Sequence, residues 1–289
     1  MALTRRNNQY YREVPMDPGI VYAAETPTAS LFAVHRDGRV MVDDVELSDA
    51  DSLALHDYTT EFHGYPVPHS GEADSVVESG GYVTAAWMGA APDISWGTPI
   101  YIGVRRSTGE TVRHLLHFAG HVLDHNPKTR RGIDNHCFPQ LFLRDSDKRL
   151  VYLGGGHHTT LYAGVSGSPH AGFNFHRLHP VGPESSNPLW GHTYPAARLV
   201  GDTLHVVSRF TTDGYQFHLA YWTVDTLTMQ TRPTTILDKA PDGHKYAIWY
   251  QQPRVEGDKL IIDTSRRWSN TGTVADLTDP EPKTYEVAI

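Results

Sequence analysis

Four short blocks in the middle of the chain combine residues that can carry protons with one that can bind a carboxylate. They are DNHCFP (134–139), GGGHH (154–158), WGHTYP (190–195) and SRF (208–210). Neutral histidine and the tyrosine phenol can take up or release a proton, and the arginine guanidinium is a permanent cation whose planar fork fits a carboxylate. A base, an acid and a carboxylate clamp are what β-elimination from a uronic acid requires, so the blocks predict that chemistry.

The blocks supply one candidate for each role in this reaction. The C5 proton of a uronate becomes more acidic when the adjacent carboxylate is neutralised; a base then removes it and an acid protonates the leaving glycosidic oxygen. We expect Arg209 to pair with the carboxylate, His136 or Tyr194 to abstract the proton, and Tyr194 or a histidine to protonate the oxygen. The predicted catalytic residues are His136, His157, Tyr194 and Arg209, with His158 as the alternative to His157.

Each of these residues also has a structural alternative. His136 could satisfy backbone groups in a loop, and Tyr194 could be a packing tyrosine whose hydroxyl reaches a neighbouring strand. Arg209 ends a predicted strand whose repeat equivalent ends in Arg266, so it could belong to a blade edge. The two histidines of GGGHH follow three glycines, which lose much conformational freedom on folding and are an unfavourable choice for a plain turn.

A repeat along the chain predicts how the blocks are positioned. Three segments align, and their leading residues, Pro139, Pro195 and Pro253, are 56 and 58 residues apart. Each has the pattern of a strand, a tight turn with Asp or Gly-Asp, and a second strand with alternating apolar residues. We expect third strands at 159–166, 217–224 and 272–278, weaker copies at 75–89 with 99–110 and at 30–44, and helix-like spacing only at 113–125.

Units of roughly 55 to 60 residues with three to four antiparallel strands are typical of β-propeller blades. We therefore expect an all-β fold, with residues 1–289 forming a single β-propeller domain of about five blades, within a range of five to seven. Residues 1–30 are expected to be an N-terminal extension or a closing strand. A β-sandwich, the alternative, is not expected to repeat a hairpin at near-constant spacing. Because the four blocks occupy matching positions of consecutive blades, their side chains should gather near the axis at one end.

The segment GHKYAIWYQQP (243–253) occupies, in the repeat led by Pro253, the position that DNHCFP and WGHTYP occupy in the two repeats before it. Its aromatic rings could stack on the apolar face of a sugar, and other polar residues of the blocks could contact the substrate. The predicted substrate-binding residues are Asn135, His158, His192, His244, Tyr246, Tyr250 and Arg267.

The run DNHCFPQLFLRDSDKRLVYLGGGHH resembles the signature of BNR-4 type propellers. The order His, His, Tyr, Arg is similar to that of the ulvan lyase families built on that fold, over roughly residues 130 to 270. In those families a His and a Tyr serve as general base and acid, a second His assists, and an Arg neutralises the uronate carboxylate. The resemblance implies these roles for His136, Tyr194, His157 or His158, and Arg209 respectively. Those lyases are generally seven-bladed and longer than this chain.

Composition restricts the partners and cofactors. A balance of 25 Lys+Arg against 33 Asp+Glu gives a formal charge of -8, which argues against a nucleic acid bound through its phosphates. Cys137 is the single cysteine, so an internal disulfide and a multi-cysteine zinc site are excluded. Some of the resembling lyases carry a structural zinc held by His and Cys. No cofactor is assigned; a structural divalent cation is the alternative, although His114, His117, His121 and His125 fit no tight four-ligand pattern.

The leading prediction is a polysaccharide lyase whose partner is a uronic-acid-containing polysaccharide, with the oligomeric state open. No signal peptide and no apolar run of about 18 residues is visible, so neither a leader nor a membrane partner is predicted; a lyase would nevertheless be expected to act outside the cell. Two alternatives are a non-catalytic carbohydrate-binding propeller and a glycoside hydrolase. A hydrolase needs paired carboxylates, whereas most acidic residues lie in expected hairpin turns, as do Asp145, Asp147, Asp202 and Asp258.

Overall fold

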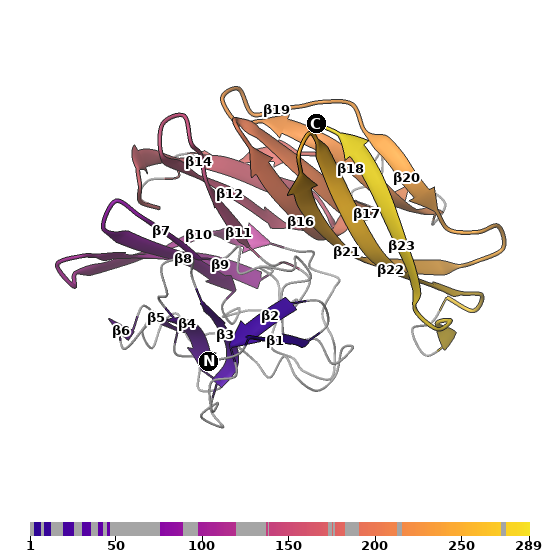
Figure 1. The fold of residues 1–289 in the computed structure, drawn as a ribbon, viewed down its shortest axis with the longest axis horizontal. Helices are drawn as coiled ribbons and strands as arrows, with labels where there is room; N and C mark the ends of the chain where they lie inside the picture. Colours follow the sequence, from indigo (N-terminus) through magenta and orange to yellow (C-terminus); the bar gives the residue numbers. More distant parts are fainter. Residues whose placement is uncertain are drawn as a thin grey trace.

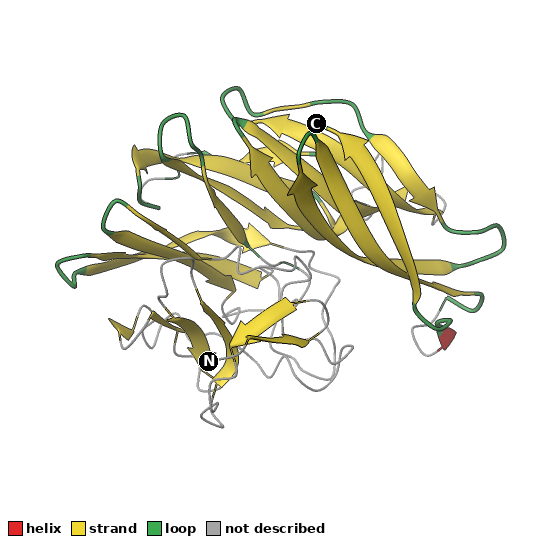
Figure 2. Ribbon diagram, in the orientation of Figure 1, coloured by secondary structure: helices red, strands yellow, loops and turns green. Residues whose placement is uncertain are grey.

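The protein is built almost entirely from antiparallel strands (Figures 1 and 2). The computed structural model describes residues 3–6, 9–12, 20–25, 31–35, 40–42, 45–46, 76–88, 98–119, 137, 139–172, 175, 177–182, 191–212, 216–272 and 276–289, and before residue 76 only the backbone path. These residues form 23 strands. None of the helical segments in the described ranges is long and apolar enough to cross a membrane. The expectation of an all-β fold is confirmed.

The N-terminal sheets form in chain order from residues 3–119. A two-stranded sheet contains β1 (Leu3–Arg6) and β2 (Gln9–Arg12). A four-stranded sheet contains β3 (Ile20–Glu25), β4 (Leu31–His35), β5 (Val40–Val42) and β6 (Val45–Glu46). The next contains β7 (Val76–Ser79), β8 (Tyr82–Met88), β9 (Thr98–Arg106) and β10 (Thr111–Ala119). In both four-stranded sheets each strand pairs antiparallel with the strand before it.

The C-terminal sheets repeat this pattern. One contains β11 (Gln140–Leu143), β12 (Arg149–Gly155), β14 (Leu161–Pro169) and β15 (His179–Val181). The next contains β13 (His157–Thr159), β16 (His192–Val200), β17 (Thr203–Thr212) and β18 (Gln216–Asp225), with β19 (Gln230–Thr231) and β20 (Thr235–Lys239) both paired to β18. The last contains β21 (Tyr246–Glu256), β22 (Lys259–Ser269) and β23 (Glu281–Ala288).

The first strands of successive sheets lie next to one another. β7 contacts β11, β11 contacts β16, and β16 contacts β21. Consecutive antiparallel sheets whose first strands meet in this way are the blades of a β-propeller. Within the described residues five sheets have three or more strands. The prediction of a propeller with about five blades is therefore confirmed.

The aligned repeats correspond to the hairpins β11–β12, β16–β17 and β21–β22, and their predicted third strands to β14 and β18. The expected third strand at 272–278 is wrong, because β22 pairs instead with β23. The Thr278 N–H donates a hydrogen bond to the Trp268 carbonyl at 2.8 Å, and the Trp268 N–H donates one to the Thr278 hydroxyl at 3.0 Å. These bonds fasten residues 276–278 to the end of β22 as a loop, so the chain reaches the edge of the sheet only afterwards.

The helix-like spacing at 113–125 is also misleading. Residues 111–119 form β10, and its register against β9 shifts between Leu115 and His117. Such a bulge adds one residue to one strand and interrupts the alternation of inward and outward side chains, which imitates a helical period. Residues 120–125 lie outside the described ranges.

Among the residues whose side chains the structure describes, three hydrophobic cores lie between consecutive blades. The first joins the β7–β10 sheet to the β11–β15 sheet, the second joins the latter to the β16–β20 sheet, and the third joins that sheet to β21–β23. β17 belongs to two of them, since Leu204 and Val206 face the preceding blade and Val207 the following one. A strand buried on both faces reads as a nearly continuous apolar run, and each buried Leu or Val contributes about 2 kcal/mol.

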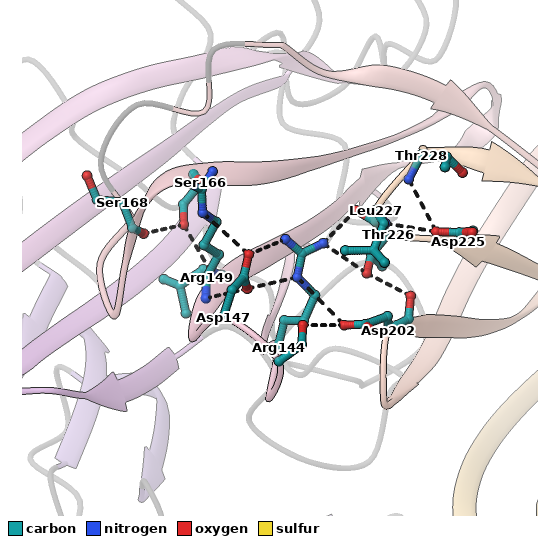
Figure 3. A network of polar contacts seen from close by, with 12 residues as sticks. Arg144, Asp147, Arg149, Ser166, Ser168, Asp202, Asp225, Thr226, Leu227 and Thr228 are labelled. Carbon is teal, nitrogen blue, oxygen red and sulfur yellow. Dashed lines mark hydrogen bonds and ion pairs between the residues drawn. The ribbon is translucent and has the colours of Figure 1, made fainter.

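A buried arginine connects the turns of two consecutive blades (Figure 3). Arg144 follows β11 and is 4 % exposed. It donates to the Asp147 carboxylate from Nε at 2.9 Å and from Nη2 at 2.6 Å, and from Nη1 to the Thr226 carbonyl at 2.7 Å. Thr226 and Ser146 both hydrogen-bond to Asp202 in the β16–β17 turn. The hydrogen bonds from Arg144 hold the pKa of Asp147 below its ordinary value.

The contacts of Arg144 predict that Arg144→Met lowers the free energy of unfolding by about 2 kcal/mol. The substitution preserves side-chain volume but leaves the Thr226 carbonyl and the Asp147 carboxylate without the guanidinium. Urea unfolding monitored by circular dichroism measures the effect. Lys148→Met is the matched control in the same turn, because the Lys148–Asp145 ion pair is exposed and should change the free energy by less than about 0.5 kcal/mol. Equal losses in the two variants would contradict the prediction.

Candidate functional site

Tyr194 lies in a bulge of β16, the first strand of its blade. The register against β17 shifts between Thr193, opposite Arg209, and Ala196, opposite Val207. Tyr194 adopts a positive φ of 54° and is 3 % exposed. For a residue other than glycine the left-handed region costs about 1–2 kcal/mol, and such strain persists only where the surroundings enforce it. The fold therefore holds the backbone of Tyr194 in a conformation that tyrosine does not favour by itself.

Arg209, on β17, lies beside Tyr194 in a group of aromatic rings. Its Cζ atom is 5.2 Å from the ring centroid of Tyr194, 5.6 Å from that of Phe217 and 5.3 Å from that of Tyr246. Nη1 donates to the Tyr246 hydroxyl at 2.9 Å and to the Ala247 carbonyl at 3.4 Å. The side chain is 1 % exposed. Cation–π contacts gain strength when desolvated, so the rings stabilise the buried charge.

Tyr246 and Tyr250, both predicted from the sequence as substrate-binding residues, belong to this group. Their strand, β21, is the first strand of the following blade and contacts β16. The rings of Tyr194 and Tyr250 are 5.6 Å apart at their centroids, and those of Phe217 and Tyr246 are 5.2 Å apart. The group formed by Tyr194, Arg209, Phe217, Tyr246 and Tyr250 is called the arginine cage below.

The two histidines after the glycines are placed only by their backbone. They lie in β13, which leaves its own blade and pairs with β16 of the next. His157 is opposite Thr193, which is opposite Arg209, so the three residues form one row across the sheet. Two strand spacings separate His157 from Arg209, or about 10 Å between backbones. His158 is the next residue in β13, whereas His136 and Asn135 lie outside the described residues.

Three other predicted substrate-binding residues lie away from the cage. His192 pairs with Phe210, one position from Arg209, and therefore faces the preceding blade, where its Nδ1 is 2.8 Å from the Ser208 hydroxyl. His244 contacts the Pro241 carbonyl and the ring of Trp268. Arg267 donates from Nε to the Thr278 carbonyl at 2.7 Å, in the loop after β22. The structure does not bring these three side chains to Tyr194 and Arg209.

The row that contains Arg209 continues to a half-buried carboxylate. Arg209 is opposite Leu219, and Leu219 is opposite Asp238 on β20. Asp238 accepts hydrogen bonds from Arg266 at 2.9 Å, from Trp249 at 3.2 Å and from the Tyr285 hydroxyl. Burial alone would raise the pKa of Asp238, but these hydrogen bonds outweigh it and hold the pKa below the ordinary value. Arg266, the repeat equivalent of Arg209, is thus paired with a carboxylate.

Two glutamines that the sequence did not reveal hold the backbone around Tyr194. Gln140 and Gln251 lie on β11 and β21, are almost completely buried and hydrogen-bond to the bulge of β16. Gln140 follows the proline of its repeat, whereas Gln251 precedes the proline of its own by two residues, so the alignment does not pair them. Phe217 was also missed, because the sequence of a strand does not indicate which residues its aromatic side chains contact.

No metal ligand set is found in the part of the chain that the structure describes. There, no group of three or more His, Cys, Asp or Glu residues is arranged to hold an ion. Cys137 is buried in the core between the second and third four-stranded sheets. Of the four clustered histidines, His117 hydrogen-bonds to the Tyr152 hydroxyl at 2.5 Å.

Comparisons with known proteins give only distant similarities. No family model and no curated protein matches the chain. Among solved structures, it is similar to the polysaccharide lyase Uly1 (TM-score 0.45, 12% identity, 73% of this chain and 51% of that one). It is also similar to an α-L-arabinanase of Cellvibrio cellulosa (TM-score 0.45, 10% identity, 91% of this chain and 89% of that one). A third similar structure is an endo-arabinanase of Bacillus licheniformis (TM-score 0.40, 13% identity, 94% of this chain and 95% of that one). The chain spans about half the length of Uly1, and these similarities do not separate a lyase from a hydrolase.

The pKa of Asp238 predicts an acid-dependent loss of stability. Because its folded-state pKa lies below the unfolded value of about 3.9, the carboxylate stabilises the fold above that pH and loses its contribution as the pH falls through the folded pKa. We expect Asp238→Asn to be less stable than the wild type by about 2 kcal/mol at neutral pH. Urea unfolding from about pH 7 to about pH 3 should show this difference narrow in acid. A difference that stays constant over this range would contradict the assignment.

Proposed function

We propose that this protein is a polysaccharide lyase that cleaves a uronic-acid-containing glycan by β-elimination. The observation that carries the proposal is the left-handed backbone of Tyr194, which holds a phenol against the Arg209 guanidinium at the first strand of a blade. Strained conformations of this kind are found at functional sites more often than elsewhere, because the fold must stabilise them. A phenol and a guanidinium are also two of the three groups that the elimination needs.

In the proposed reaction a uronate carboxylate binds the guanidinium of Arg209. In the structure the Tyr246 hydroxyl accepts a hydrogen bond from Nη1 of Arg209, and the substrate carboxylate is proposed to replace this hydroxyl as the acceptor. Neutralising the carboxylate stabilises the negative charge that develops when the C5 proton leaves. The electron pair of that C–H bond becomes the C4–C5 double bond, the bond from C4 to the glycosidic oxygen breaks, and that oxygen receives a proton. One chain end therefore carries an unsaturated uronate and the other a new hydroxyl.

Tyr194 is proposed to transfer one of these protons, and a histidine the other. His157 shares the row of Arg209, which supports a histidine of β13 as the second group. His136 is retained as the alternative base. Tyr246 and Tyr250 are proposed to contact the sugar ring next to the cleaved bond, because both belong to the arginine cage.

The state of Asp238 favours a lyase over a glycoside hydrolase. A hydrolase requires one carboxyl group that remains protonated until it donates to the leaving oxygen. Asp238 is the carboxylate that the described residues place on the row of Arg209, and it is half-buried. Its lowered pKa and its hydrogen bonds from Arg266, Trp249 and Tyr285 keep it ionised and occupied. It is suited to joining two blades and not to donating a proton.

The proposal predicts that Tyr194→Phe lowers kcat by about 10²- to 10⁴-fold, the usual contribution of a general acid or base. Phenylalanine keeps the ring against Arg209, so binding and stability should change little. Turnover is followed by the ultraviolet absorbance of the unsaturated uronate over a panel of uronic polysaccharides. Full activity of the variant would refute the role of Tyr194.

Tyr221→Phe is the matched control for this experiment. Its hydroxyl bonds His205 at 2.8 Å on the same face of the same sheet, but Tyr221 is not part of the arginine cage. It should retain wild-type turnover. For the wild type, new reducing ends without absorbance would favour a hydrolase, and binding without any cleavage would favour a carbohydrate-binding propeller; either result would overturn the proposal.

A further inference from the structure

The bulge that contains Tyr194 is held from both sides by buried glutamine side chains. Gln140, on the preceding blade, donates from Nε2 to the Pro195 carbonyl at 2.9 Å and accepts from the Ala197 N–H at 3.1 Å. Gln251, on the following blade, donates from Nε2 to the Tyr194 carbonyl, and to the Val207 carbonyl at 3.3 Å. The first strands of three consecutive blades are therefore joined by amide side chains at this point.

These contacts supply hydrogen-bond partners for backbone groups that the bulge removes from the sheet. Two residues of β16 oppose one residue of β17 there, so the backbone groups of Tyr194 and Pro195 fall outside the regular ladder. Pro195 has no N–H to contribute. Buried carbonyls without a donor cost about 1–3 kcal/mol each, and the two glutamines supply donors where the strands cannot.

The two glutamines differ in what they hold. Gln140 uses both ends of its amide on the backbone of Pro195 and Ala197, beyond the strained residue. Gln251 donates from Nε2, and among the described residues its buried Oε1 has no hydrogen-bond partner. Its donor bridges the Tyr194 carbonyl and the opposite strand β17. The left-handed peptide of Tyr194 is thus tied directly to Gln251.

We infer that Gln251 is a positioning residue that sets the direction of the Tyr194 side chain toward Arg209 through the Tyr194 carbonyl. The neighbouring Tyr250 packs its ring 5.6 Å from that of Tyr194, so one short segment of β21 determines both the backbone and the ring environment. The inference rests on the proposed function and adds a residue that controls the reaction without touching the substrate.

Kinetics of Gln251→Met and Gln140→Met test this role. Methionine preserves length and volume but removes the amide, and both variants should lose similar stability in thermal unfolding. We expect kcat of Gln251→Met to fall about 10²-fold with KM nearly unchanged, because a small displacement of a reacting group is sufficient for such a loss. Gln140→Met should keep the wild-type kcat. An equal fall of kcat in both variants, or in neither, would overturn the inference.

A spectroscopic measurement separates the inference from the proposed function. With 3-fluorotyrosine at position 194, the ¹⁹F resonance should move in Gln251→Met and stay in place in Gln140→Met. If Gln251→Met does not fold, Gln251→Asn, whose shorter amide cannot bridge both carbonyls, replaces it. The same response in both variants would refute the positioning role even in an active lyase. A selective response in a protein without lyase activity would instead refute the proposed function and leave the control of Tyr194 by Gln251 intact.

Discussion

The bulge at Tyr194 and Pro195 is the constraint on which the candidate site depends. It places an aromatic residue in the left-handed region within a strand that is buried among three blades. Such a conformation survives only if the displaced backbone groups find partners. Gln251, on the following blade, provides the partner of the Tyr194 carbonyl, and Gln140, on the preceding blade, holds Pro195 and Ala197 beyond it. The site is thus a property of the assembled propeller and not of one hairpin.

Packing between blades decides where charge can be placed. The strands of the central blades are buried on both faces, so each charged group between them requires a specific compensation. Arg144 is compensated by carboxylates and carbonyls of adjacent turns, and Asp238 by three donors. Arg209 is compensated by aromatic rings and leaves its guanidinium bonded to a phenol and a carbonyl. Arg209 is the cation proposed to bind a substrate carboxylate, because its guanidinium lies against the ring of Tyr194 at the first strand of a blade.

Alternation along the strands explains which predicted residues meet. His192 and Tyr194 are only two positions apart, yet the bulge between Thr193 and Ala196 changes the register that would otherwise relate them. His192 faces the blade before, with Phe210 and Trp222, whereas Tyr194 contacts Arg209 and the blade after. Spacing in the sequence placed both at the start of one blade, but it could not assign them to opposite faces.

The architecture could be predicted from the sequence because the signals for strands and turns are local. Proline-led hairpins at 56- and 58-residue intervals and alternating apolar residues specify strands and turns, and they predicted β11–β12, β16–β17 and β21–β22. The sequence also brought Tyr194, Arg209, Tyr246 and Tyr250 together as candidates. The last strand, the bulges and the glutamine contacts could not be predicted in this way, because they depend on how the blades pack. A bulge depends on which backbone groups find a partner across the interface, and that partner, Gln251 for Tyr194, lies 57 residues away on another blade.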